Sequence, residues 1–471
     1  MNYADSEKIH MILIGAGYKK VIDPVKADII ILNTCSVRQK WEDRVFWFIH
    51  EVWLYHKKND TKQKPLFGIT GCMVRKTWMA KRYIQNDAYQ RSQIQDISLL
   101  HSEDLLGNYD DALFLRSQEI DFTFRIEEVS YLTKLLTLIC NKDIGNDSKF
   151  NEYLAVKQLQ ENPASANVII QTGCDNYCTY CIVPYTRWRE ISRSIDDIIQ
   201  EIQTVVLSGT KEVTLLGQNV NSYGKEVRKK LWDMKELTWI HKDVTTPFRE
   251  LLNHIDAIDW IDRIRFTSSN PHDMTKDILD AHVQLKKMCN YLHFAMQSGS
   301  NSLLKRMNRK HTYEDFKAQV EYLRKRDPLF SISTDIIVWF PGETEEEFQD
   351  TIHAMKECQF DFAYIARYSP RSGTYAYDAY KDDITPHEKA RRWNTLNNLL
   401  EESVLNRSKL MIGREEEILI SGKWRSNGWV GRTRNFKEVY ISNESNVAIW
   451  DLVRVHIHSL DGWNLQWILV S

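Results

Sequence analysis

The sequence lacks several features that would assign a protein to a class at once. No apolar run is long enough to span a bilayer, and the first residues, MNYADSEK, lack the basic and apolar segments of a secretory signal. The net charge is only −2, from 62 basic and 64 acidic residues, so electrostatics alone neither requires nor excludes a nucleic-acid partner. We therefore expect a cytoplasmic, globular protein with about three domains.

Glycine is scarce, whereas tryptophan is abundant. The 18 glycines are 3.8% of the 471 residues, about half of the usual ~7%. The 15 tryptophans are 3.2% of the same chain. Two of these tryptophans, Trp188 and Trp339, stand in predicted loops beside recognisable motifs.

The sequence does contain a closely spaced trio of cysteines. Cys174, Cys178 and Cys181 follow an apolar run at CxxxCxxC spacing. Three thiolates can hold three corners of a four-iron cluster and leave the fourth iron open, whereas a closed structural zinc site needs a fourth ligand. No cysteine or histidine stands near enough in sequence to be that ligand, so the spacing predicts an iron–sulfur cluster. A zinc loop completed by a distant residue and a set of buried thiols remain the alternatives.

Two further cysteines follow predicted strands near the N-terminus. The buried run 27–33 predicts a parallel strand that leads to Cys35, and residues 66–70 predict another that leads to Cys72. Parallel sheets bind ligands at the carboxyl ends of their strands, so each thiol is either a ligand or an ordinary core residue. Helices are predicted at 5–16, ending at Gly17, and at 37–57.

Six apolar runs between residues 165 and 395 predict strands separated by helices. Their period of about 30 to 50 residues is typical of βαβ units, so we expect a partly closed parallel barrel whose reactive face lies after the strands. Polar groups follow several of these strands, and Thr344 with Glu347 forms a helix capping box. Cys140, Cys289 and Cys358 are interpreted as structural. The predicted strands are 167–171, 212–216, 263–267, 291–296, 332–338 and 362–368.

The C-terminal part changes to short alternating runs. Residues 386–403 predict a polar helix, and 404–471 predict a small antiparallel barrel that either binds RNA or packs against the rest of the chain. Arg187, Arg189 and Arg193 lie downstream of the cysteine trio, where they either bind phosphate or carboxylate groups or form a solvated surface. The tail strands are expected at 417–420, 438–441, 448–457 and 465–470, and a polar linker at 141–152.

These motifs resemble the methylthiotransferase branch of the radical S-adenosylmethionine (SAM) enzymes, and most closely the MiaB-type enzymes that act on isopentenylated adenosine in tRNA. The matching segments cover nearly the whole chain in the order that the family has them. They are residues 33–38, 71–73, 173–187, 215–224, 263–268, 297–300 and 335–343.

The resemblance implies an α/β fold in three domains. An N-terminal α/β methylthiotransferase domain, truncated at its start, would occupy residues 1–125, and a linker or insertion would occupy 126–164. A partial parallel (β/α)6 radical SAM barrel is implied at 165–395. A small antiparallel β-barrel of the TRAM type, which helps to hold RNA, is implied at 404–471.

The resemblance also implies two [4Fe–4S] clusters. Cys174, Cys178 and Cys181 would hold the first, whose open iron takes the amino and carboxylate groups of SAM. Reductive cleavage of SAM there yields a deoxyadenosyl radical, which removes hydrogen from C2 of the adenine at position 37 of tRNA. Cys35 and Cys72 would help to hold the second cluster, which passes on a methylated sulfur. Strand-end residues assigned to SAM are Gln218, Ser268, Gln297 and Asp335.

Partners and alternatives follow from the same likeness. The expected partners are the tRNA anticodon stem-loop and an electron donor such as flavodoxin or ferredoxin, with the enzyme itself a monomer away from membranes. Three alternatives remain: the same chemistry on another modified adenosine, the same chemistry on a ribosomal protein, or an RNA-binding relative without a working second cluster.

The sequence departs from the family pattern in two respects. The family has three cysteines for the second cluster, and we expect the first of them just upstream of Met1, in a longer native chain. In addition, Trp188 and Trp339 stand where the family has glycine, and an indole there would clash with a closely approaching ligand. We hypothesise that a codon read here as tryptophan, and normally a stop codon, is read as glycine in the source organism.

Overall fold

The structure is a computed structural model, and the chain forms two compact units. Unit 1 comprises residues 1–159 and 182–188, and unit 2 comprises residues 160–181 and 189–471. The described residues are 1–35, 39–59, 64–74, 113, 116–140, 153–156, 164–187, 189–225, 245–424, 428–442, 447–461 and 464–469. The polar linker predicted at 141–152 and the residue Trp188 lie outside them.

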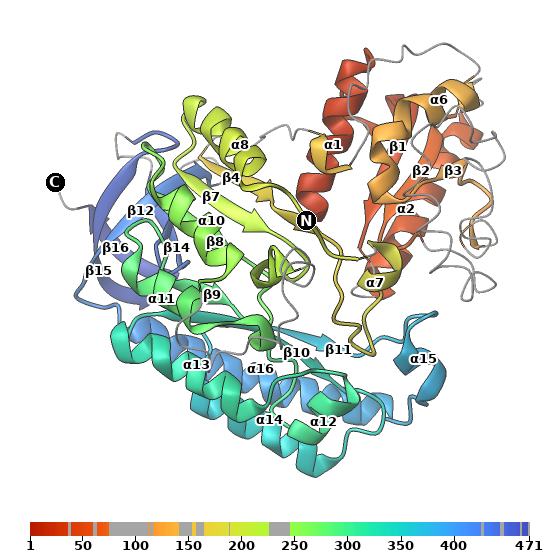
Figure 1. The fold of residues 1–471 in the computed structure, drawn as a ribbon. Coiled ribbons are helices and arrows are strands. Elements are labelled where there is room, and N and C mark those ends of the chain that lie inside the picture. Colours follow the sequence, from red (N-terminus) through yellow and green to blue (C-terminus); the bar gives the residue numbers. More distant parts are fainter. Residues whose placement is uncertain are drawn as a thin grey trace. The chain divides into compact units, whose positions relative to one another are not determined.

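Unit 1 is built on a three-stranded parallel sheet in the order β1-β2-β3. Its core contains the fully buried side chains of Ile49, Phe67 and Ile69. The strands are β1 (Ile29–Thr34), β2 (Leu66–Gly71) and β3 (Phe122–Thr123), and the helices are α1 (Asn2–Gly15), α2 (Gln39–Lys58) and α6 (Leu132–Cys140), with 3-10 turns η1 (Pro24–Lys26), η4 (Ile126–Tyr131) and η5 (Tyr153–Ala155) (Figure 1).

The predicted elements of unit 1 are present with small shifts. The first helix begins at Asn2, three residues earlier than predicted, and Gly17 follows it with a φ of +87°. Both predicted strands are parallel neighbours. Cys140 differs from its structural interpretation, because it is half-buried at the end of α6 and not part of a closed core.

Unit 2 contains six parallel strands in sequential order. One sheet has the order β4-β7-β8 and the next has the order β9-β10-β11. Parallel bridges from Ile264 to Met288 and from Ser269 to Phe294 connect the edges of the two sheets. The six predicted strands are therefore confirmed as a partial barrel. They are β4 (Ser165–Ile169), β7 (Glu212–Leu216), β8 (Arg263–Phe266), β9 (Tyr291–His293), β10 (Ser331–Val338) and β11 (Phe362–Arg367).

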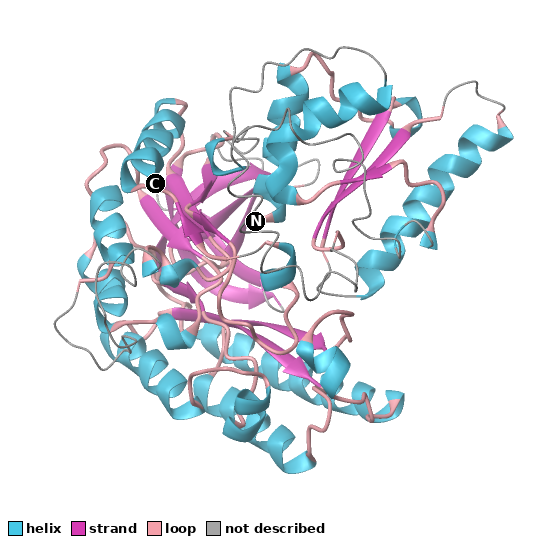
Figure 2. Cartoon of the chain, turned by 45° about the vertical axis from the view of Figure 1, so that its right-hand side comes forward, coloured by secondary structure: helices cyan, strands magenta, loops and turns pink. Residues whose placement is uncertain are grey.

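Helices cover the outer face of these strands, as Figures 1 and 2 show. Their buried apolar side chains, such as Ile198, Leu251 and Phe316, join a core with the strand residues Val213 and Ile332. Thr344 begins α14 with the predicted capping box. The helices are α8 (Ile195–Leu207), α10 (Pro247–Asp256), α11 (Lys276–Gln284), α12 (Asn301–Arg306), α13 (Tyr313–Arg326), α14 (Glu345–Cys358), α15 (Tyr375–Ala379) and α16 (Pro386–Lys409), with 3-10 turns η6 (Val220–Ser222) and η7 (Pro271–Asp273).

The C-terminal strands close into a small barrel in the order β12-β13-β14-β16-β15. All neighbouring pairs are antiparallel except β14 and β16, which share one parallel pair. The alternating pattern predicted this barrel but missed β13, which contains two glycines and an arginine in six residues. The strands are β12 (Glu415–Lys423), β13 (Gly428–Thr433), β14 (Glu438–Ser442), β15 (Leu452–Asp461) and β16 (Asn464–Leu469).

Two buried arginines join the two barrels of unit 2. Arg263 donates to the carbonyls of Glu417 (2.8 Å) and Arg432 (2.6 Å). Arg265 donates to the carbonyls of Thr433 and Arg434, both at 2.8 Å, and to Glu212 Oε2 at 2.8 Å. Because these guanidinium groups are almost fully buried, their hydrogen bonds fix the small barrel to the end of β8.

None of the helices in the described residues is long and apolar enough to cross a lipid bilayer.

Candidate active site

The three cysteines lie on one loop after the short strand β5 (Gln171–Thr172), which pairs with β6 (Ile191–Ser192). Gly173 opens the loop with a φ of +79°, a conformation that glycine adopts without steric cost. The side chains of all three cysteines, Cys174, Cys178 and Cys181, are half-buried. The backbone N–H of Cys181 donates to the carbonyl of Cys178 at 2.9 Å, so these two residues share one tight turn.

The electrostatics of the loop favour a bound cation. Burial raises the pKa of the Cys174 thiol, and the neighbouring Cys181 and Cys178 raise it further. A metal centre supplies the positive charge that deprotonates such thiols. Among the described side chains, no three cysteine, histidine or carboxylate groups converge as they would around a single metal ion. The preference for an iron–sulfur cluster over a closed zinc site therefore rests on the spacing of the three cysteines, which leaves one iron open.

Gln218 and Ser268 follow β7 and β8, and Gln297 lies in the loop after β9, whereas Asp335 lies inside β10, so its predicted strand-end placement is wrong. Gln297 donates its backbone N–H to the carbonyl of Asp335 at 2.8 Å. His293 connects Ser268 with Asp335, because its Nδ1 accepts from the backbone N–H of Ser268 at 3.2 Å and its Nε2 lies 3.3 Å from Asp335 Oδ2. Ser268 and Gln297 have φ values of +67° and +73°, which are unusual for residues other than glycine and mark functional sites in many proteins.

Unpaired amide atoms point to a ligand at the same strand ends. Both polar atoms of the Gln218 side chain are buried without a hydrogen-bond partner among the described residues, and so is Oε1 of Gln297. A buried amide without a partner costs about 1–3 kcal/mol, which a bound ligand can recover. These atoms are consistent with the assignment of Gln218 and Gln297 to a polar ligand, which stays a prediction.

Sequence reasoning missed two residues at this site. His293 lies on a predicted strand, where a histidine among apolar neighbours was the available signal. Arg309 donates to Cys178 Sγ at 3.5 Å, although 131 residues separate the two. No local pattern in the sequence links Arg309 to the cysteines.

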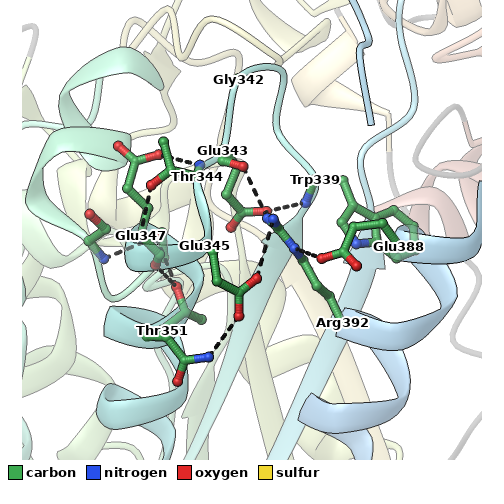
Figure 3. Close-up of polar contacts among 12 residues, drawn as sticks. Trp339, Gly342, Glu343, Thr344, Glu345, Glu347, Thr351, Glu388 and Arg392 are labelled. Atoms are coloured by element: carbon green, nitrogen blue, oxygen red, sulfur yellow. Dashed lines mark hydrogen bonds and ion pairs between the residues drawn. The ribbon is translucent and has the colours of Figure 1, made fainter. Parts of the chain in front are cut away.

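Glu343 follows β10 and is held in a buried network (Figure 3). Its Oε2 accepts from the backbone N–H of Trp339 at 2.7 Å and from Arg392 Nη1 at 3.0 Å. Burial raises the pKa of Glu343 to about 7, although the N–H of Trp339 and the Arg392 guanidinium act in the opposite direction. The carboxyl group thus fixes the turn after β10.

In unit 1, the other two candidate ligands end neighbouring strands. Thr34 pairs with Gly71 in the parallel register, so Cys35 and Cys72 occupy equivalent next positions. The N–H of Cys72 donates to the carbonyl of Thr34 at 3.0 Å, and both thiols are half-buried. The predicted placement of each cysteine at the carboxyl end of a strand is therefore confirmed, and the register makes these two strand ends neighbours. Their role as ligands stays a prediction.

The arginines after the cysteine loop do not form one basic surface. Arg187 is buried in unit 1 and forms an ion pair with Asp5, so its interpretation as a solvated surface charge is wrong, and binding of a phosphate or carboxylate ligand stays a prediction. Arg193 is paired with Glu201 at 2.5 Å, and only Arg189 is exposed. Arg187 was misjudged because its partner lies 182 residues earlier in the chain.

The partial barrel and its three-cysteine loop define a radical SAM enzyme. The Radical SAM superfamily matches residues 168–355, and uncharacterized protein family UPF0004 matches residues 1–89. The chain belongs to the tRNA-2-methylthio-N(6)-dimethylallyladenosine synthase family. This agrees with the family that the sequence motifs resemble.

Two curated relatives illustrate the likeness. The synthase of Carboxydothermus hydrogenoformans is 35% identical over 100% of this chain and 97% of its own length. That of Caldicellulosiruptor saccharolyticus is 36% identical over 94% of this chain and 84% of its own length. Among solved structures, the radical SAM methyltransferase TsrM of Kitasatospora setae is a distant likeness, with 13% identity and a TM-score of 0.42 over 72% of this chain and 75% of that one.

Proposed function

We propose that this enzyme replaces the hydrogen on C2 of N6-dimethylallyladenosine in tRNA, next to the anticodon, with a methylthio group. The observation that carries the proposal is the near full-length identity of 35–36% to relatives named for this activity. The donor set of three cysteines on one loop supports it, because this chemistry needs a cluster with an open iron. When bound, two [4Fe–4S] clusters and SAM supply the electron, the radical and the methylated sulfur.

The chain's own residues bind and orient these groups. Cys174, Cys178 and Cys181 would hold the cluster that binds SAM, and Cys35 and Cys72 would contribute to the other cluster. Gln218, Ser268 and Gln297, which follow barrel strands, and Asp335, inside β10, would contact SAM. The buried amide atoms of Gln218 and Gln297 without partners in the described part of the chain support this assignment. Residues 1–125 would form the methylthiotransferase domain, 126–164 a linker or insertion, 165–395 the radical SAM barrel and 404–471 the RNA-holding barrel.

The partners and the cellular place belong to the same proposal. A small electron carrier such as flavodoxin or ferredoxin would reduce the cluster, and the enzyme would act as a cytoplasmic monomer on the anticodon stem-loop.

The test begins with the protein in the form in which its own organism makes it, reconstituted anaerobically with iron and sulfide. The product assay then uses tRNA that carries N6-dimethylallyladenosine, SAM and a chemical reductant, with mass analysis of the nucleosides. We expect the methylthio product from the parent and none from Cys174→Ala. The matched control Cys289→Ala removes a buried thiol away from the loop, and it should keep the product. A parent that binds iron but leaves this tRNA unchanged would overturn the proposal.

A further inference from the structure

The segment that follows α12 holds the cysteine loop in place. The backbone N–H and the hydroxyl of Thr179 donate to the carbonyls of Met307 (3.1 Å) and Arg306 (3.0 Å). Asn308 Nδ2 donates to the carbonyls of Tyr177 (2.9 Å) and Asn176 (3.2 Å). We call residues 306–309 the brace, because they fix the backbone between the first and last cysteines.

The brace is itself anchored at one end. Arg306 places Nη1 2.7 Å from Glu347 Oε1 and Nη2 2.5 Å from Glu347 Oε2. A bidentate pair of this kind fixes orientation as well as distance. Glu347 also accepts from the backbone N–H of Thr344 at 3.1 Å, so the brace is tied to the start of α14.

Arg309 extends from the brace to a sulfur atom. Its Nη1 donates to Cys178 Sγ at 3.5 Å, while its Nη2 donates to the Ala295 carbonyl (2.8 Å) and to Asn270 Oδ1 (3.0 Å). Its Nε is buried without a partner among the described residues. One rigid guanidinium thus links the cysteine loop to the loops after β8 and β9.

We propose that Arg309 is a positioning residue that raises the reduction potential of the cluster on the cysteine loop. This inference rests on the proposed function, because it needs that cluster. Its hydrogen bond to Cys178 and its positive charge stabilise the reduced cluster, which carries one more negative charge than the oxidised cluster. The electron comes from the external donor and no bond changes at Arg309. The guanidinium therefore makes delivery of this electron easier.

The test uses the full chain with Cys35→Ala and Cys72→Ala, so that only the cluster on the cysteine loop forms. The variants are Arg309→Gln, Arg309→Lys and Asn308→Ala, each reconstituted anaerobically. Iron is counted, and the midpoint potential is measured by a redox titration followed by electron paramagnetic resonance. The last variant is the matched control, because Asn308 holds the loop backbone without a contact to sulfur.

We expect Arg309→Gln to keep about four irons per chain and to titrate at a lower potential than the parent. Arg309→Lys should restore part of the potential, because it retains the charge but not the fork of donors. Asn308→Ala should bind less iron, with an unchanged potential in the cluster that forms. If Arg309→Gln binds no iron, the inference is tested by comparing the midpoint potential of Arg309→Lys with that of the parent.

A parent-like potential in the deciding Arg309 variant would overturn the inference, and so would an equal shift in Asn308→Ala. A parent that binds no iron would instead overturn the proposed function.

A separate observation concerns tryptophans in a backbone conformation that suits glycine. Trp260, Trp339 and Trp450 have φ values of +70°, +68° and +88°. They are three of the nine non-glycine residues with positive φ in the described part of the chain, although tryptophan is only 15 of 471 residues. Bulky residues rarely occupy this region, whereas glycine enters it freely.

Trp339 shows the mismatch most clearly. It is 1% exposed, and its indole N–H has no hydrogen-bond partner among the described residues. Its backbone N–H, in contrast, donates to Glu343 Oε2 in the turn after β10 (Figure 3). Trp393, in the helix α16, has a partner for its indole N–H, the carbonyl of Ile365 at 3.2 Å. The hydrogen bond of the turn at 339 therefore comes from the backbone of this residue, whereas its indole makes only packing contacts, in the core and beside Arg367.

We infer that Trp260, Trp339 and Trp450 are glycines in the native protein. The sequence would then contain a codon that is a stop in the standard code, is read here as tryptophan, and is read as glycine in the source organism. The low glycine and high tryptophan counts agree with this inference.

Peptide mass spectrometry of the protein isolated from its own organism tests the inference. We expect glycine at all three positions. Trp53 and Trp393, which lie inside helices where glycine is unfavourable, are the matched controls and should remain tryptophan. Tryptophan at any of the three positions, or glycine at both controls, would overturn it.

Discussion

Trp260 allows the cost of the left-handed backbone to be measured separately from packing. It lies between α10 and β8 with a φ of +70°, and it is 77% exposed. Trp260→Gly and Trp260→Ala both remove the indole, so the two variants lose the same contacts. They differ in the backbone, because alanine keeps a strain of about 1–2 kcal/mol and glycine does not. Glycine in turn loses about 0.5–1 kcal/mol through its greater freedom in the unfolded chain.

The balance predicts that Trp260→Gly is more stable than Trp260→Ala by about 0.5–1 kcal/mol. Glu321, an exposed residue inside α13, is the control position. There Glu321→Ala should be more stable than Glu321→Gly by about 1 kcal/mol, which is the usual helical order. Urea unfolding of the four variants gives both differences. If alanine is the more stable residue at both positions, the backbone argument for Trp260 is wrong.

The remaining predictions concern buried charges in unit 2. Burial raises the pKa of Glu343 from 4.5 to about 7. Between these two pH values the folded state keeps a proton that the unfolded state releases, so the free energy of unfolding falls as the pH rises. Glu343→Gln should abolish this fall of up to about 3 kcal/mol. If urea unfolding shows that the variant depends on pH as the parent does, the reasoning is wrong. Arg265→Ala leaves Glu212 buried without this ion-pair partner, so it should lower the free energy of unfolding by about 3–5 kcal/mol. Arg432→Ala breaks an exposed pair and should lower it by less than about 1 kcal/mol. Equal losses for the two variants in urea unfolding would contradict the buried-pair argument.

The sequence predicted the elements whose signal is local. The six barrel strands are apolar runs, and their βαβ spacing forces them to be parallel neighbours. The strand β13 was missed because Gly428, Gly431 and Arg432 interrupt its apolar pattern, and its position depends on pairing with β12 and β14. Packing against neighbouring strands, rather than intrinsic preference, decides such segments.

The same difference between local and long-range signals applies to the residues of the candidate site. The cysteines could be found because metal ligands on one loop keep a short spacing. The groups that support them could not, because Arg309 and Asn308 approach the loop from a helix end about 130 residues later. Cys35 and Cys72 were an intermediate case, since each follows a recognisable strand and the parallel register brings them together.

The contrast between Arg187 and Arg309 shows why sequence position is a poor guide to what an arginine does. Arg187 lies six residues after Cys181, yet it is paired with Asp5 within unit 1. Arg309 is distant in sequence and donates directly to a cysteine sulfur. A guanidinium is always charged, so when it is buried its acceptors decide its function. For Arg187 the acceptor is a carboxylate, which makes a structural pair. For Arg309 the acceptors are a sulfur, an amide oxygen and a carbonyl, none of which carries a fixed negative charge. Ionised thiols, as in a bound cluster, would place negative charge beside this guanidinium.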